Sequence, residues 1–185
     1  TKRKTRKKKK IREHYHRLIK NSAEKIVQRE VNKIKDLVNK ELKNESRNER
    51  NFRDALVEFY NNKFPDEIKK TMMPVIRNLA DAVAKEAAKE TGIKEYNIEE
   101  FFSEYITAMS NRYAGFSRGQ LLALIDEVGD IDEAVVFVEG RLEEWEEKRA
   151  NKWANEQAVK AEGAFTRHVY TLAGVAELVW IAGPE

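Results

Sequence analysis

Histidines are the first residues to test for chemistry, because a neutral imidazole can ligate a metal or act as a base near neutral pH. The sequence has three of them, His14, His16 and His168. Histidines that share a metal on one helix normally lie three or four residues apart, whereas His14 and His16 lie two apart and point to different faces. No serine or cysteine motif marks His168 as the base of a nucleophilic site. We therefore expect packing or surface roles for all three.

Carboxylates are the next candidates, since four glutamates lie within residues 143–147. Such a cluster could bind a divalent cation or supply paired groups for acid–base work. A site for a hard cation needs several converging oxygens, usually with a glycine-containing loop, and this stretch has no such loop. Lys148 and Arg149 lie within helical reach of Glu144 and Glu146, which favours paired surface charges. We predict no metal site here.

Phosphate-loop and thiol chemistry are also missing from the sequence. The nearest approach to a glycine-rich loop, residues 115–119, lacks both the spacing and the lysine of a P-loop. There is no cysteine, so the chain has neither a disulfide nor a thiolate metal site. Trp145 and Trp153 lie close to one helical face, which favours core or subunit-contact anchors over a cofactor pocket. The sequence thus predicts no catalytic residues, no cofactor and no metal.

The strongest electrostatic feature is the first ten residues. They hold eight cations and no acid: Lys2, Arg3, Lys4, Arg6, Lys7, Lys8, Lys9 and Lys10. Such a segment attracts phosphates, and the logarithm of its affinity for duplex falls by about 0.9 per neutralised phosphate per decade of salt. No aromatic residue is interleaved, so base stacking is not supported. The segment predicts contact with DNA or another nucleic acid, contact with an acidic protein, or a solvated tail.

Charge and hydrophobicity bound the class of protein. The net charge is +3, so residues 11–185 carry −5, and residues 126–147 hold ten acids against the single cation Arg141. Charged residues make up 36% of the chain and hydrophobic residues 41%, which is more typical of a long-helix assembly protein than of a compact enzyme. No apolar run approaches the roughly 18 to 20 residues of a membrane helix, so we expect no membrane contact.

The elements that must position these residues are helices. Apolar spacings of three and four run through almost the whole chain, which predicts an all-α fold. A stripe from Ile11 to Leu42 predicts a long first helix, a rod of about 45 Å that needs a partner to bury it. Further helices are expected over residues 52–63, 65–91, 98–115, 117–128 and 131–173, the last stretch being either one helix broken near Gly140 or two helices in close succession. Their predicted caps are Asn97, Ser117 and Asp130, and their predicted ends are Gly92 and Gly115.

We expect this chain to form an elongated multi-helix bundle in four parts. These parts are a basic arm (residues 1–10), a long projecting helix (11–50), a helical domain (51–174) and the start of a truncated strand-containing segment (175–185). The stretch 178–181 has strand character but no partner strand, and a lone strand is not stable by itself. It is therefore expected to pair with something outside this chain or to be poorly ordered.

One part of the chain carries a set of residues similar to a known signature. They are Arg141, Leu142, Trp145, Arg149, Ala150, Glu156, Gly174, Val175, Trp180 and Ile181. A glutamate-bearing helix that ends at an Ala-Gly-Val turn and leads into a strand with a central Trp resembles the phage head-morphogenesis family, the Mu F-type minor head proteins. The resemblance covers roughly residues 144–181, with Trp145, Glu156, Gly174 and Trp180 as its marker positions.

The resemblance implies a non-enzymatic minor head or head-morphogenesis protein, or the region of a portal protein fused to such a domain. Its expected partners are the portal or other capsid proteins, with DNA contacted through the basic arm. It would act as an oligomer in the virion, after assembly in the host cytoplasm. The family continues into a Cys-x-x-C pair that this sequence lacks, so we expect a piece of a longer protein.

Two alternative functions stay open at this point. One is a helical nucleic-acid-binding module that uses the cations of residues 1–10. The other is a non-catalytic part of a larger phage-encoded enzyme or toxin polyprotein.

Overall fold

The computed structural model describes residues 2–175, and for residues 2–6 and 8 it describes the backbone only. All regular structure in this range is helical, which confirms the predicted all-α class. The elements are α1 (Lys2–Glu41), α2 (Glu49–Glu58), the π-helical turn η1 (Phe59–Lys63), α3 (Phe64–Thr91), α4 (Glu99–Asp126), α5 (Ile131–Glu144), the π-helical turn η2 (Trp145–Arg149) and α6 (Ala150–Leu172). The predicted strand at 178–181 lies outside the described residues. None of the helices described is both long enough and apolar enough to cross a membrane.

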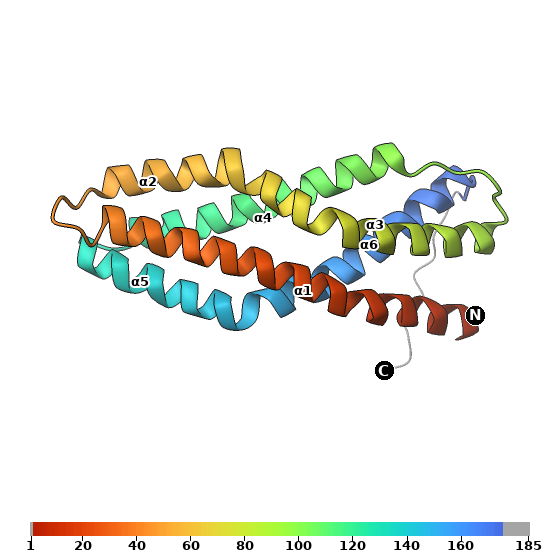
Figure 1. Cartoon of the computed structure of the whole chain (residues 1–185). Coiled ribbons are helices and arrows are strands. Elements are labelled where there is room, and N and C mark those ends of the chain that lie inside the picture. Colours follow the sequence, from red (N-terminus) through yellow and green to blue (C-terminus); the bar gives the residue numbers. More distant parts are fainter. Residues whose placement is uncertain (1, 176–185) are drawn as a thin grey trace.

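These elements form four long rods that lie side by side in an elongated bundle (Figure 1). The rods are α1, the continuous run α2–η1–α3, α4, and the run α5–η2–α6. Short connections at residues 42–48, 92–98 and 127–130 reverse the chain direction each time, as in other antiparallel bundles. Helix α1 packs against α3 and α6, and α3 also packs against α4.

One hydrophobic core joins the rods, from Ile19 in α1 to Val169 in α6. The stripe of α1, with Ile26 and Ile34 among its members, is buried in this core. Residues 11–50 were expected to project from a separate helical domain. Helix α1 instead forms one wall of the bundle. The physical reason is that each large apolar side chain gains about 1.5–3 kcal/mol when it leaves water, and α3 and α6 bury the stripe.

Several predicted helix ends are present. The Asp130 carboxylate caps α5 by accepting a hydrogen bond from the Glu133 backbone N–H at 2.9 Å. Helix α3 ends at Gly92, whose φ of 77° lies in the left-handed region that favours glycine. The Asn97 side chain accepts from the Glu99 backbone N–H at 2.8 Å, but the N-cap residue of α4 is Ile98, one residue later than predicted.

Three predicted interruptions are wrong. Helix α4 runs unbroken through Gly115, and Ser117 is buried within it, with its hydroxyl donating to the Tyr113 carbonyl at 3.2 Å. The break near Gly140 is likewise absent, because α5 continues through that residue. The alternative of two helices in close succession over residues 131–173 is confirmed, since α5 and α6 follow each other on either side of η2. The expected break before Phe64 is instead the π turn η1, and the irregularity of the last rod falls at η2. A π turn absorbs an extra residue within a helix, so the rod continues where a break was expected.

Candidate functional site

The two π turns bring polar side chains to the same point in the bundle. Turn η1 carries Tyr60 and turn η2 carries Arg149, and both side chains reach Glu30 in the middle of α1. A π turn shifts the direction of the side chains around it, and such turns occur frequently at functional sites. The place where these side chains meet is therefore the first candidate for a functional site on this fold.

This feature is a buried polar cluster centred on the Glu30 carboxylate, which has no exposed surface. The Tyr60 hydroxyl donates to Oε1 of Glu30 at 2.9 Å, and the Tyr113 hydroxyl donates to Oε2 at 2.7 Å. Arg149 Nη1 lies 3.3 and 3.4 Å from the same two oxygens. Arg149 Nη2 donates to the Ser117 hydroxyl at 2.6 Å. Each of these buried polar groups thus has a hydrogen-bond partner. A buried polar group without one would destabilise the fold.

The tyrosines of the cluster act as hydrogen-bond donors and not as proton shuttles. Burial raises the pKa of Tyr60 and of Tyr113 well above its ordinary value, and the nearby Glu30 charge raises it further. Both phenols therefore keep their protons at neutral pH. Tyr105, farther along α4, behaves in the same way, since burial raises its pKa to about 12. Its hydroxyl donates to Gln157 at 3.2 Å.

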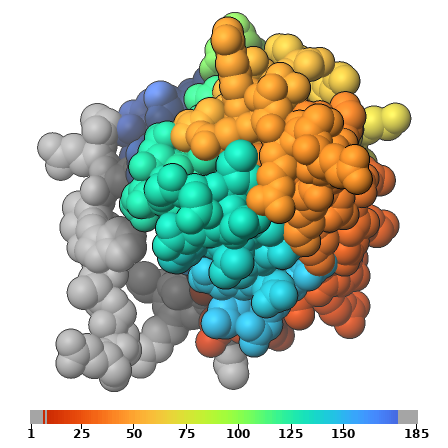
Figure 2. All heavy atoms as spheres, turned by 90° about the vertical axis from the view of Figure 1, so that its left-hand side faces the viewer, coloured from red at the N-terminus to blue at the C-terminus, as the bar shows by residue number. Residues whose placement is uncertain are grey.

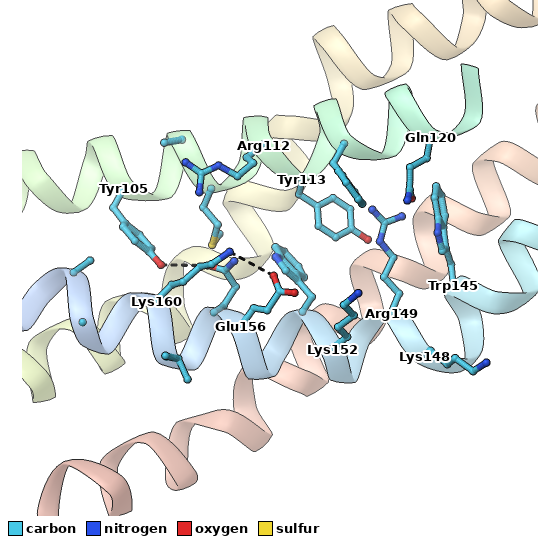
Figure 3. A pocket seen from close by; sticks show the side chains of 18 of the residues that line it. Tyr105, Arg112, Tyr113, Gln120, Trp145, Lys148, Arg149, Lys152, Glu156 and Lys160 are labelled. Atoms are coloured by element: carbon cyan, nitrogen blue, oxygen red, sulfur yellow. Dashed lines mark hydrogen bonds and ion pairs between the residues drawn. The ribbon is translucent and has the colours of Figure 1, made fainter. Parts of the chain in front are cut away.

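Arg149 joins this cluster to the molecular surface. Its guanidinium lies 4.2 Å from the centre of the Tyr113 ring and 3.9 Å from the centre of the Trp145 ring (Figure 3). Cation–π contacts of this kind are worth about 0.5–2 kcal/mol, more when the cation is desolvated. The side chain of Arg149 is only 11% exposed, and Glu30 holds its guanidinium in place. The Glu30 cluster therefore also fixes the two aromatic rings that pack on either side of this guanidinium.

Those rings form the floor of a groove between α4 and the rod α5–η2–α6, with a volume of about 860 Å³. The Tyr113 and Trp153 rings pack 4.3 Å apart, and both are buried, as is Trp145. The groove is lined by Tyr105, Ala108, Met109, Arg112, Tyr113, Phe116, Gln120, Arg141, Glu144, Trp145, Lys148, Arg149, Lys152, Trp153, Glu156, Gln157, Val159, Lys160, Gly163, Ala164 and Arg167. We call this surface the α4–α6 groove.

The α4–α6 groove is strongly basic. Its lining includes seven cations and two carboxylates. Lys160 lies 3.5 Å from Glu156 (Figure 3), and Arg141 lies 3.5 Å from Glu144, so both carboxylates are already paired. Arg112, Lys152 and Arg167 form no ion pair among the residues that the structure describes. A surface with this excess of positive charge over an aromatic floor suits a partner that is both acidic and partly apolar.

The family-marker positions converge on this groove only in part. Trp145 forms part of its floor and Glu156 lies in its lining, exposed and beside Lys160. Gly174 lies just past the end of α6 with a φ of 74°, away from the groove lining. Trp180 lies outside the described residues.

Of the basic segment of residues 1–10, the three lysines whose side chains are described lie outside the groove lining. Residues 2–10 are the first turns of α1, and Lys7, Lys9 and Lys10 are exposed there. Lys7 Nζ lies 2.6 Å from the Glu86 carboxylate of α3, so one cation is held against the bundle. Lys9 lies 3.8 Å from Glu13. For Lys2, Arg3, Lys4, Arg6 and Lys8 only the backbone is described.

Three of the four glutamates in residues 143–147 form ion pairs among the described residues, but with different partners from those predicted, and Glu143 forms none. Glu146 binds Lys35 of α1 at 3.1 Å, and Glu144 lies 3.5 Å from Arg141. Arg149 turns inward to Glu30 because η2 alters the helical register after residue 145. Within residues 2–175 no group of three or more potential ligands is placed to hold a metal ion.

Of the histidines, His168 packs against a neighbouring ring, which is one of the two roles expected for it. Its ring stacks on Phe101 at 4.2 Å with an angle of 5° between the planes. The His14 ring meets Tyr15 edge to face at 4.9 Å, on the same helix.

The Glu30 cluster was not predicted from the sequence, although the position of Glu30 in the apolar stripe of α1 indicates it. Glu30 follows Ile26 by four residues and precedes Ile34 by four, so it occupies a core position of the α1 stripe. A charged residue at such a position needs partners inside the fold. The identities of these partners, Tyr60 and Arg149 among them, depend on contacts between residues far apart in the sequence.

Comparison with protein-family models, curated proteins and solved structures finds no match to this chain.

Proposed function

We propose that this chain is a non-enzymatic assembly protein of a phage head, a minor head or head-morphogenesis protein or the corresponding region of a portal protein. It acts by binding portal or other capsid proteins in the virion, after assembly in the host cytoplasm, and it uses no cofactor. The observation that carries the proposal is the α4–α6 groove, an open basic surface over a fixed aromatic floor.

Two properties of the groove favour protein docking. Its floor is rigid, because Arg149 is held by Glu30 and Ser117 and in turn positions Tyr113 and Trp145. A preorganised surface loses little entropy when a partner binds. Aromatic residues and arginines are also the residue types that contribute most to binding energy at protein interfaces. Trp145 and Glu156, two positions of the resemblance to head-morphogenesis proteins, belong to this surface.

The polar groups that converge in this fold are unsuited to catalysis. Glu30 is closed off from solvent, and the phenols beside it have raised pKa values that keep them protonated. A general acid or base works best with a pKa near the operating pH and must reach the substrate. The cluster therefore supports a role in shaping the groove.

The proposal is tested by sizing the purified chain with a phage portal ring. At micromolar concentration we expect the chain to elute with the ring, and a variant with the groove charges reversed, Lys152→Glu with Arg167→Glu, to elute alone. A chain that stays separate from the ring at these concentrations would count decisively against the proposed function.

Contact with DNA through residues 1–10 is a second candidate function. It is favoured by the exposure of Lys9 and Lys10 on the first turns of α1, where Lys10 has no ion pair among the described residues. Replacing both lysines with glutamine should weaken binding to duplex DNA and reduce the salt dependence of that binding by about 0.9 per lost phosphate contact. Unchanged affinity and salt dependence would exclude this contact.

A further inference from the structure

The most exposed large apolar side chains of the described residues fall into two pairs. Val136 is 68% exposed and Phe137 is 48% exposed, and both lie on α5. Phe116 and Val159, 61% and 54% exposed, lie in the α4–α6 groove. Single exposed apolar residues are ordinary, but neighbouring ones form the kind of surface against which other molecules pack. The two pairs differ sharply in the charge that surrounds them.

The pair on α5 lies among carboxylates. The exposed side of this helix carries the residues Asp132, Glu133, Val136, Phe137, Glu139 and Glu143, and we call it the α5 acidic ridge. Asp132 pairs with Arg47 and Glu139 pairs with Lys43, where the start of α5 meets the connection after α1 (Figure 2). Glu133 and Glu143 form no ion pair among the described residues. The ridge thus presents two unpaired carboxylates around two apolar side chains.

The acidic ridge and the basic groove adjoin each other on the molecule. Phe137, Arg141 and Glu144 are spaced by four and three residues, so they share one side of α5. Arg141 and Glu144 belong to the groove lining, and Phe137 lies one turn before them on the ridge. The face is therefore acidic at the start of α5 and basic along α6, with exposed apolar residues in each part.

We propose that a second copy of this chain covers this face, related to the first by a two-fold axis near Trp145. An antiparallel arrangement places the acidic ridge of each copy on the groove of the other, so the contact is satisfied twice. Val136 and Phe137 then enter the groove beside Phe116 and Val159. Among the surfaces that the described residues form, the ridge is the one that matches the groove in both charge and exposed apolar residues.

The size of the face is sufficient for a stable dimer. The ridge and the adjoining half of the groove extend over about 27 residues, which is about 40 Å of helix. The groove half is two helices wide, about 20 Å, and the ridge half is one helix wide, about 10 Å, so each copy would bury roughly 600 Å². The total of about 1,200 Å² lies at the lower end of the range for stable specific interfaces. This dimer rests on the proposed function in one respect only, since it takes the groove to be a protein-docking surface.

Charge reversal on each side of the contact tests the dimer. We expect the chain to sediment as a dimer at micromolar concentration and low salt. The ridge variant, Glu133→Lys with Glu143→Lys, and the groove variant, Lys152→Glu with Arg167→Glu, should each lower the association constant at least about tenfold, because like charges then face each other. An equal mixture of the two variants should form a mixed dimer, since acid and base are matched again in both contacts.

A matched control separates this contact from a general effect of charge. Lys25→Glu with Lys33→Glu changes the net charge as much as the groove variant does, on exposed positions of α1 that do not line the groove. The control should dimerise like the unmodified chain, and circular dichroism should show unchanged helix content in all variants. Since all reversed positions are exposed, loss of folding is not expected.

Three results would overturn the dimer. They are an unmodified chain that stays monomeric at hundreds of micromolar, a mixture of variants that does not associate, and open chains of copies in place of a closed dimer. If the chain is monomeric and still elutes with the portal ring, the dimer alone fails. If the chain dimerises, and neither the chain nor the monomeric ridge variant, whose groove is uncovered, elutes with the ring, the proposed function fails and the dimer stands.

Discussion

Replacing Glu30 with glutamine is the sharpest test of the buried cluster. The substitution keeps the shape of the side chain and removes the charge that pairs with Arg149 at 3.3 Å. It also replaces one acceptor oxygen with an NH₂ donor, which faces the hydroxyl of Tyr60 or Tyr113 or the guanidinium itself. The cation would then be left in a nearly closed site, 11% exposed, without its carboxylate.

The expected loss of stability follows from the burial of this pair. Removing one partner of a buried ion pair costs about 3–5 kcal/mol, because the remaining charge is uncompensated. A domain is stable by about 5–15 kcal/mol in total, so the loss is a large fraction of it. For a chain of this size about 2–4 °C of Tm is lost per kcal/mol, which gives a fall of about 6–20 °C.

Urea unfolding followed by circular dichroism at neutral pH measures this change directly. The control is Glu24→Gln, which removes an exposed carboxylate that lies 3.8 Å from Lys20 on the same helix and should cost less than about 0.5 kcal/mol. Replacing Glu30 and Arg149 together by leucine should cost less than the sum of the single changes, because no lone charge is left. A loss below about 1 kcal/mol for Glu30→Gln would refute the assignment of the cluster as a structural centre.

Three further outcomes are expected. Folding raises the pKa values of Tyr60 and Tyr113, so the unfolded chain loses these protons at a lower pH than the folded chain. The free energy of unfolding should therefore fall as pH rises above about 10, by about 1.4 kcal/mol per pH unit for each tyrosine. Equal urea midpoints on both sides of about pH 10 would contradict this. Glu156→Gln, at an exposed position, should change the free energy of unfolding by less than about 0.5 kcal/mol and leave the dichroism spectrum intact. Gly92→Ala should lower stability by about 1 kcal/mol in calorimetry because φ is 77°, whereas Gly163→Ala, inside α6, should not lower it.

Much of the fold could be predicted because its determinants are local. The stripe of α1 repeats every three or four residues, and Gly92 and Asp130 act through their own backbone and neighbours. The predicted ends at Gly115 and Ser117 are wrong because packing outweighs a local preference. A glycine within a helix destabilises it by about 1 kcal/mol relative to alanine, whereas burial of the Tyr113 and Leu121 side chains on either side of Gly115 stabilises the continuous helix by more than that.

The site could be predicted less well, because it is made by contacts between distant residues. Trp145 was expected to be an anchor and lies in the groove floor. Arg149 was expected to pair on the surface, and no helical spacing indicates that a π turn directs it to Glu30, 119 residues away. The basic groove likewise combines cations of α4 and α6, such as Arg112 and Lys152, which are separate in the sequence.

The central claim, that the α4–α6 groove is a protein-docking surface, can be tested by crosslinking from a single site. This chain has no cysteine, so Val159→Cys places one photoreactive label in the groove, and Lys25→Cys places the same label on α1, outside the groove. In a mixture with portal ring, we expect adducts to a second copy or to the portal from position 159 and none from position 25. Equal labelling from both positions, or no adduct from position 159, would contradict it.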